Sequence, residues 1–425
     1  MNDVSKHLHD FVKELATSTL STSINMRSAS LLSNKSVGFL KKIYQQLTQA
    51  EHTWTNQRES ILATLTLDNY SMKENASYSL IPPEIKTQIE THPYVIYNYQ
   101  FKVGQRTVAA SILIPTPVGD TPPPAILKRK INTMIYRIFL WLSIATKHAT
   151  NGCTNHMRLF FYMSDHLKIT PQQQKAPVNW INANTAFTTL CSPTTDITLF
   201  REEEWFKVFI HETFHNLGLD FSRYDRETTV ADAAVLQHYT VKIADLRLYE
   251  TYCEMWAEIL NTMFIAHATT RIKGDFDTVY RKMDKLLRAE RIWSMFQCVK
   301  VLHHHQIVYS HILRHPIINH NTNTGGSDAP SSSYTEKTNA FCYYVLKSIL
   351  MFHTDDFIQW VIKYNNNSLM FTKQNTMGYA KLITDRCQAT EYTTMISEIE
   401  KWFKRHTHNT GFVMKTMRMT VSEIE

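Results

Sequence analysis

The sequence predicts an α+β fold that is mainly helical and contains a few short strands. Runs with strand character occur only between residues 93 and 200, whereas most of the remaining chain has the apolar spacing of helices. Apolar residues make up 43% and aromatic residues 12% of the chain, which favours a folded protein over a disordered one. A length of 425 residues is enough for a large core with two or three subdomains.

The first half of the chain contains the predicted strands. Residues 1–90 are expected to be helical, and a hairpin is expected from residues 93–101 and 105–114, turning at Val103 and Gly104. The proline-rich residues 115–124 mark a linker or loop. The next elements are an apolar helix, a buried strand and a second short strand, at residues 132–149, 158–163 and 196–200.

The second half is predicted to be helical. Helices are expected at residues 205–217 and 246–264, and one or two more at 276–302. Glu202, Glu203 and Glu204 stand where the first helical turn of 205–217 would begin, and Gly218 suits its end. We divide the chain into an N-terminal helical region, a central core, a flexible loop and a C-terminal helical region, at residues 1–90, 91–320, 321–335 and 336–425.

The segment His211-Glu212-Thr213-Phe214-His215 is an H-E-x-x-H motif. Residues four apart on a helix share one face, so His211 and His215 can bind one metal ion together. Glu212 follows the first histidine, where a carboxylate can reach a water molecule on the metal. The motif therefore predicts a zinc hydrolase site. The alternative is a surface helix that carries two incidental histidines.

A zinc site of this kind needs a third protein ligand. In one class the ligand follows the helix, as H-E-x-x-H-x-x-G-x-x-H/D, but that position is Phe221 here and Asp220 misses it by one residue. In another class a glutamate comes from a later helix. The predicted helix 246–264 carries an acidic stripe spaced by four, formed by Glu250, Glu254 and Glu258. A solvated helix face is the alternative interpretation of this stripe.

The two helices resemble those of the zincin superfamily of metallopeptidases, in its gluzincin branch, where the third ligand lies in an E-x-x-x-D/E motif. Glu254-Met255-Trp256-Ala257-Glu258 fits that motif. The resemblance implies that zinc is bound by His211, His215 and Glu254, and that Glu258 accepts a hydrogen bond from a ligand histidine. The long gap after His215 leaves Glu250 as a rival ligand.

The resemblance covers roughly residues 90–350. The runs HETFHNLGLDFS and YCEMWAE also look like uncharacterised zincin-like proteins encoded by large DNA viruses. By this resemblance residues 91–320 form a zincin-like core with a small mixed β-sheet before the active-site helix. Residues 183–190 resemble the edge strand that pairs with the substrate backbone. Taken alone, those residues fit an ordinary loop-to-strand segment equally well.

The favoured function is that of a zinc-dependent peptidase with Zn²⁺ as cofactor, a peptide or protein as substrate, and Glu212 as general base. A downstream side chain could also donate a proton to the oxyanion; the candidates are the histidine cluster His303, His304, His305, His311, His315 and His320, and Tyr334, Tyr343 and Tyr344. The histidine cluster has no acidic partner nearby, so packed or solvated histidines are favoured there over a second metal. The alternative function is a catalytically silent structural or binding protein of zincin fold, for instance in a virion.

Charge and cysteine content bound the remaining functions. The net charge of +7 is mild for this length and its lysines and arginines are scattered, so neither a nucleic-acid partner nor a membrane partner is expected. A nucleic-acid-associated protein remains the weakest alternative. We expect no signal peptide and no transmembrane segment, and therefore a cytoplasmic location or a virion if the protein is viral. The six cysteines lack a C-x-x-C motif and are expected to be reduced thiols.

Overall fold

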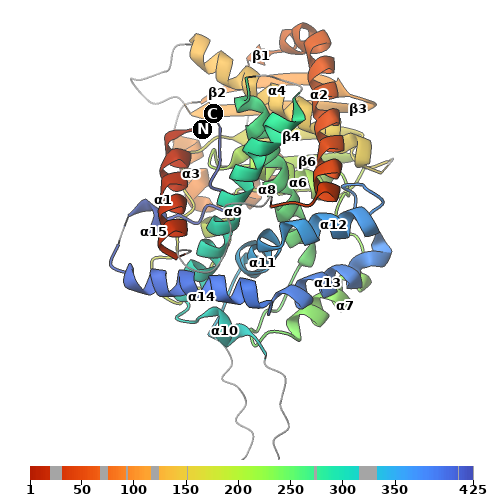
Figure 1. Ribbon diagram of the computed structural model, residues 1–425. Helices are drawn as coiled ribbons and strands as arrows, with labels where there is room; N and C mark the ends of the chain where they lie inside the picture. Colours follow the sequence, from red (N-terminus) through yellow and green to blue (C-terminus); the bar gives the residue numbers. More distant parts are fainter. Residues whose placement is uncertain are drawn as a thin grey trace, which may run out of the picture.

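The computed structural model describes residues 1–19, 31–67, 75–91, 94–115, 124–150, 152–271, 275–314, 333–409 and 411–424. These residues form an α+β fold that is mainly helical and has one small mixed sheet, as expected (Figure 1). The predicted loop 321–335 lies outside the described residues up to residue 332. Most of the predicted linker 115–124 also lies outside them, as do His315 and His320.

The sheet has six strands in the order β1-β2-β3-β4-β6-β5. Their bounds are Thr66–Leu67, Tyr94–Val103, Arg106–Pro115, His156–Tyr162, Ala186–Thr188 and Thr194–Leu199 for β1 to β6. Strands β3, β4 and β6 are parallel, whereas the pairs β1–β2, β2–β3 and β5–β6 are antiparallel. Among the described strands the short β5 is therefore an edge of the sheet, as the family resemblance implied for residues 183–190.

The predicted hairpin is formed by β2 and β3. Val103 pairs with Arg106, so Gly104 and Gln105 make the turn, one residue later than expected. Gly104 has a φ of 60°, a left-handed conformation that costs glycine little.

Helices fill the rest of the described chain. Before the last strand they are α1 (Asp3–Thr19), α2 (Asn34–Ala63), the 3-10 helix η2 (Ala76–Leu80), α3 (Pro83–Thr91), α4 (Pro124–His148) and α5 (Trp180–Ala183). The next are α6 (Trp205–Asn216), α7 (Asp225–Leu236), α8 (Leu248–Thr269), α9 (Phe276–His304) and α10 (Tyr309–Ile312). The last are the π-helical η3 (Phe341–Leu346), α11 (Lys347–Phe352), α12 (Thr354–Tyr364), η4 (Lys373–Asn375), α13 (Thr376–Arg386), α14 (Thr390–Arg405) and α15 (Phe412–Lys415).

Helix α6 lies between the sheet and α8. Phe209 packs edge-on against Phe161 of β4 at 5.6 Å between ring centroids, and Phe214 stacks on Trp141 of α4 at 6.0 Å. On its other side Phe206 contacts Phe264 of α8 at 5.0 Å. Every residue of α6 is buried, and Gly218, with a φ of 63°, allows the chain to turn away after it.

One hydrophobic core extends from Leu8 of α1 to Ile424 and includes the strands and the C-terminal helices. The two ends of the chain lie side by side, because the Asn2 amide donates to the Glu423 carbonyl at 3.3 Å (Figure 1). Of the helices that are described, none is both long and apolar enough to cross a lipid bilayer.

Candidate metal centre

The two motif histidines face one another at the buried side of α6. Their Nε2 atoms are 3.1 Å apart, and both side chains are almost fully buried. This follows from the spacing of four on a helix, which places the second ring one turn after the first. A catalytic zinc site has three protein ligands, and two imidazole nitrogens that point to one place can supply two of them.

Glu250, in the first turn of α8, completes this group. Its Oε2 lies 3.1 Å from His211 Nε2 and 3.4 Å from His215 Nε2. Burial raises the pKa of Glu250, but His215 and His211 outweigh burial and hold that pKa below its ordinary value. Two imidazole nitrogens and an ionised carboxylate are the donor set of a catalytic zinc site, so these three side chains fit that metal. The geometry thus favours the rival ligand of the sequence analysis.

Glu254, to which the family resemblance assigned the third ligand, stands one helical turn further along. Its Oε1 is 2.8 Å from His211 Nδ1, on the side of the ring that faces away from His215 and Glu250. Its other oxygen accepts a hydrogen bond from the ammonium group of Lys207, which is also buried. Burial raises the pKa of Glu254, but Lys207 and His211 lower it far more. An ionised carboxylate on Nδ1 leaves Nε2 as the metal-binding nitrogen.

Asp220 contacts Nδ1 of the second histidine, His215, as Glu254 contacts Nδ1 of His211. Its Oδ2 is 2.6 Å from His215 Nδ1, and the Ser222 hydroxyl donates to its Oδ1 at 3.0 Å. From the sequence, Asp220 is one residue away from the ligand position of the H-E-x-x-H-x-x-G-x-x-H/D pattern, and this role as a histidine partner was not predicted. Its position just after the turn at Gly218 was the available signal, because the turn brings the chain back beside the helix.

Glu258 does not contact a histidine, contrary to the role implied for it. Its Oε1 accepts a hydrogen bond from Lys347 Nζ at 2.6 Å, and both side chains are buried. Burial raises the pKa of Glu258 to about 8. The expected E-x-x-x-E arrangement is therefore present one turn earlier, with Glu250 beside both histidines and Glu254 behind one of them.

Glu212 lies beside the histidines, with 7% of its surface exposed. Burial raises its pKa, although His211 and His215 act in the opposite direction. Within the described ranges, its carboxylate has no hydrogen-bond partner, so it is free to accept a proton. The Tyr343 hydroxyl is also close, because it donates to Glu250 Oε2 at 3.1 Å.

The other candidate proton donors point elsewhere. The Tyr334 hydroxyl donates to Glu336, and the Tyr344 hydroxyl donates to the Met417 carbonyl. His304 Nε2 lies 2.9 Å from the Ala176 carbonyl, and the ring of His305 packs against Tyr334. Among the described residues, each group that could hold a metal includes His215, and none includes His303, His304, His305 or His311.

A cleft of about 720 Å³ opens onto the four site residues His211, Glu212, His215 and Glu250. The whole of β5 lines it, and residues 242–245 and 335–339 contribute further to its lining. No described strand pairs with the free edge of β5. The cleft therefore places the side chains that could hold a metal beside the free edge of β5. An extended peptide could pair with that edge as an additional strand.

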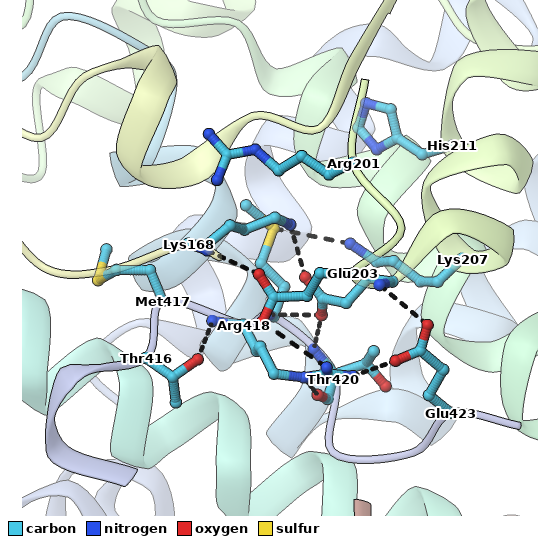
Figure 2. A network of polar contacts seen from close by, with 12 residues as sticks. Lys168, Arg201, Glu203, Lys207, His211, Thr416, Met417, Arg418, Thr420 and Glu423 are labelled. Carbon is cyan, nitrogen blue, oxygen red and sulfur yellow. Dashed lines mark hydrogen bonds and ion pairs between the residues drawn. The ribbon is translucent and has the colours of Figure 1, made fainter. Parts of the chain in front are cut away.

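An ionic network lies beneath the centre and surrounds the segment 416–424 (Figure 2). Lys168 Nζ is 2.5 Å from Glu204 Oε2, and Glu204 Oε1 accepts the backbone N–H groups of Met419 and Thr420. Glu204 precedes α6 in a left-handed conformation, and its side chain makes no capping hydrogen bond to the helix. Lys207 connects this network to Glu254, since its ammonium group also lies 3.6 Å from Met419 Sδ.

Two of the six cysteines form a disulfide, Cys153–Cys191, which corrects the expectation of reduced thiols. The partners are 38 residues apart in sequence, so no local spacing revealed them. The other four, Cys253, Cys298, Cys342 and Cys387, are buried free thiols.

Comparison of this chain with protein-family models, with curated proteins and with solved structures gave no match. The functional assignment therefore depends on the chemistry of the site itself.

Proposed function

We propose that this protein is a zinc-dependent peptidase of the zincin type, with zinc bound by His211, His215 and Glu250. The observation that carries the proposal is the convergence of His211 Nε2, His215 Nε2 and Glu250 Oε2 within 3.4 Å of one another beside an open cleft. A zinc ion held by these atoms would act as a Lewis acid and lower the pKa of water.

The side chains of the chain supply the other requirements of peptide hydrolysis. Glu212 is the general base, because its carboxylate lines the cleft, lacks a hydrogen-bond partner among the described residues and has a raised pKa. It can return the proton to the leaving amine. Tyr343 is the best placed of the candidate donors to stabilise an oxyanion, since its hydroxyl reaches the Glu250 carboxylate.

The substrate in this proposal is a peptide in extended conformation. The free edge of β5 offers backbone N–H and C=O groups, and the strand lines the cleft beside the histidines. A peptide that pairs with this edge would lie across the zinc ligands. The Glu250-x-x-x-Glu254 spacing supports the gluzincin assignment better than the Glu254-x-x-x-Glu258 spacing does.

Metal analysis and a peptide-library assay of three proteins test the proposal. Wild type should contain one zinc per chain and cleave peptides, whereas His211→Ala should lose the metal. Glu212→Gln should keep the zinc and lose at least ~10²-fold in rate, because an amide cannot accept and return the proton. Wild type without zinc, even after zinc is added, would refute the metal site. Wild type with zinc but without cleavage would favour the structural alternative, and a fully active Glu212→Gln would exclude the mechanism.

A further inference from the structure

Asn216 ends helix α6 and directly follows the metal-binding residue His215. It is fully buried, and its side chain uses both donors and its acceptor oxygen. Its Nδ2 donates to Thr188 Oγ1 at 3.0 Å and to the Thr189 carbonyl at 3.3 Å. Its Oδ1 accepts hydrogen bonds from the Thr154 and Thr195 hydroxyls, both at 3.1 Å.

These bonds join three separate segments to the metal-binding helix. Thr188 ends β5 and Thr189 directly follows it, Thr195 belongs to β6, and Thr154 precedes β4. The Thr154 hydroxyl also donates at 2.8 Å to the Asn216 carbonyl, a group at the helix end that has no partner within the helix itself. One side chain therefore connects the histidine-bearing helix to the strand that lines the cleft.

Strand β5 needs such a connection because it is short and pairs on one side only. It has three residues, and among the described strands its only partner is β6. Short edge strands open locally at little cost in free energy. The nearby disulfide joins Cys191 to Cys153 and not to α6, so it restrains the turn after β5 without aligning the strand with the histidines.

We infer that Asn216 is a positioning residue: it holds β5 in register with the metal-binding helix and thereby aligns the bound peptide with the zinc ligands. The inference rests on the proposed function, because it concerns the substrate of that site. A displacement of about 1 Å in a substrate-positioning element can lower the rate by about 10²-fold. Asn216 touches neither metal nor substrate and acts through Thr188 and Thr189.

The test compares Asn216→Ala with Asn365→Ala. Asn365 is an equally buried asparagine whose side chain bonds to the Tyr252 hydroxyl and the Thr372 amide, away from the cleft. Each protein is assayed with a long peptide cleaved by wild type and with the same peptide trimmed to a few residues around the cleaved bond. Zinc content and amide hydrogen exchange of residues 186–189 are measured in the same samples.

We expect Asn216→Ala to keep its zinc, to exchange faster at residues 186–189, and to lose about 10- to 100-fold in kcat/KM for the long peptide only. Asn365→Ala should retain the wild-type preference for the long peptide. A general structural defect would lower kcat/KM for both substrates together, and that result would overturn the inference. Faster exchange with an unchanged preference would also overturn it.

Thr188→Val is a second, milder variant that removes one acceptor of the Asn216 amide. In the Thr188→Val background, Asn216→Ala should lower kcat/KM for the long peptide by a smaller factor than it does in wild type, because the two residues share one contact. Strictly additive effects would show that Asn216 does not act through β5. A wild type that lacks zinc or activity would instead show that the proposed function has failed, and the inference would fall with it.

Discussion

The three glutamates of the stripe on α8 have the same spacing but three different environments. Glu250 contacts both histidines, Glu254 contacts His211 and Lys207, and Glu258 forms an ion pair with Lys347. The pKa values of Glu250 and Glu254 are lowered, whereas burial raises that of Glu258 to about 8. Spacing on one helix therefore identified the acidic face but not the role of each carboxylate.

Substitution of the three glutamates by glutamine should separate these roles. Glu250→Gln removes the proposed third ligand and should cause the largest loss of zinc affinity. Glu254→Gln should lower zinc affinity by about 10- to 100-fold, because Glu254 only orients His211. Glu258→Gln should change zinc affinity little, since an amide resembles the protonated carboxyl favoured by a pKa of about 8. Competition with a chromophoric chelator measures all three. A loss at Glu254 that equals or exceeds the loss at Glu250 would restore the ligand implied by the resemblance.

At the scale of elements, the segment 416–424 is unusual because it is buried without belonging to a sheet or a long helix. Four of its N–H groups, those of residues 419–422, are satisfied by carboxylates instead. Glu290 of α9 accepts from the Val421 amide at 2.8 Å, the Ser422 amide at 3.0 Å and the Thr420 hydroxyl at 2.7 Å. Glu204 Oε1 accepts hydrogen bonds from the Met419 and Thr420 amides in the same way. Buried N–H groups must be paired, so these acids make the path of the segment possible.

Glu290→Gln should therefore destabilise the protein by about 2–3 kcal/mol, because an amide loses one acceptor and directs its NH₂ group at a backbone N–H. Urea unfolding followed by fluorescence measures the change in free energy. Glu59→Gln, an exposed position on α2, is the matched control and should change stability by no more than about 0.5 kcal/mol. Equal stability of Glu290→Gln and wild type would show that the segment is held by its apolar contacts alone.

At the scale of the whole molecule, three histidines that are buried or half-buried make stability depend on pH. Burial lowers the pKa of His148, His305 and His353 to about 4, below the ordinary value of 6.5. Between these two values the unfolded chain binds protons that the folded chain does not. The contribution of these three histidines to the free energy of unfolding should therefore be complete above pH 6.5 and should be lost as the pH falls toward 4.

His305→Phe isolates one of these contributions. The His305 ring is fully buried, and neither of its nitrogens has a hydrogen-bond partner among the described residues. The variant should lose less stability than wild type between pH 7.5 and pH 5, by about 1–3 kcal/mol. The same substitution at His52, which is exposed on α2, should leave the pH dependence unchanged. Parallel pH profiles for wild type and His305→Phe would refute the role of this histidine.

Many of the local elements of this protein could be read from its sequence, although β1 lies within the region 1–90 that was expected to be helical and α7 was not predicted. Apolar periodicity identified the helices that became α4, α6, α8 and α9, and the β2–β3 hairpin followed from two strand-like runs around a glycine. The pairing of His211 with His215 depends only on helix geometry, so the motif predicted it directly. Each of these features depends on residues that are close together in the sequence.

The packing of α6 against α8 decides which glutamate lies beside the two histidines. Phe206 meets Phe264 and Phe214 meets Tyr252, so α6 and α8 run antiparallel and their contacts set the register. A shift of one helical turn, about 5.4 Å, would exchange Glu250 for Glu254, and no local pattern contains that information. The same holds for Asp220, Asn216, the Cys153–Cys191 disulfide and the buried segment 416–424. Their partners come from distant parts of the chain, and only the packing of the complete core brings them together.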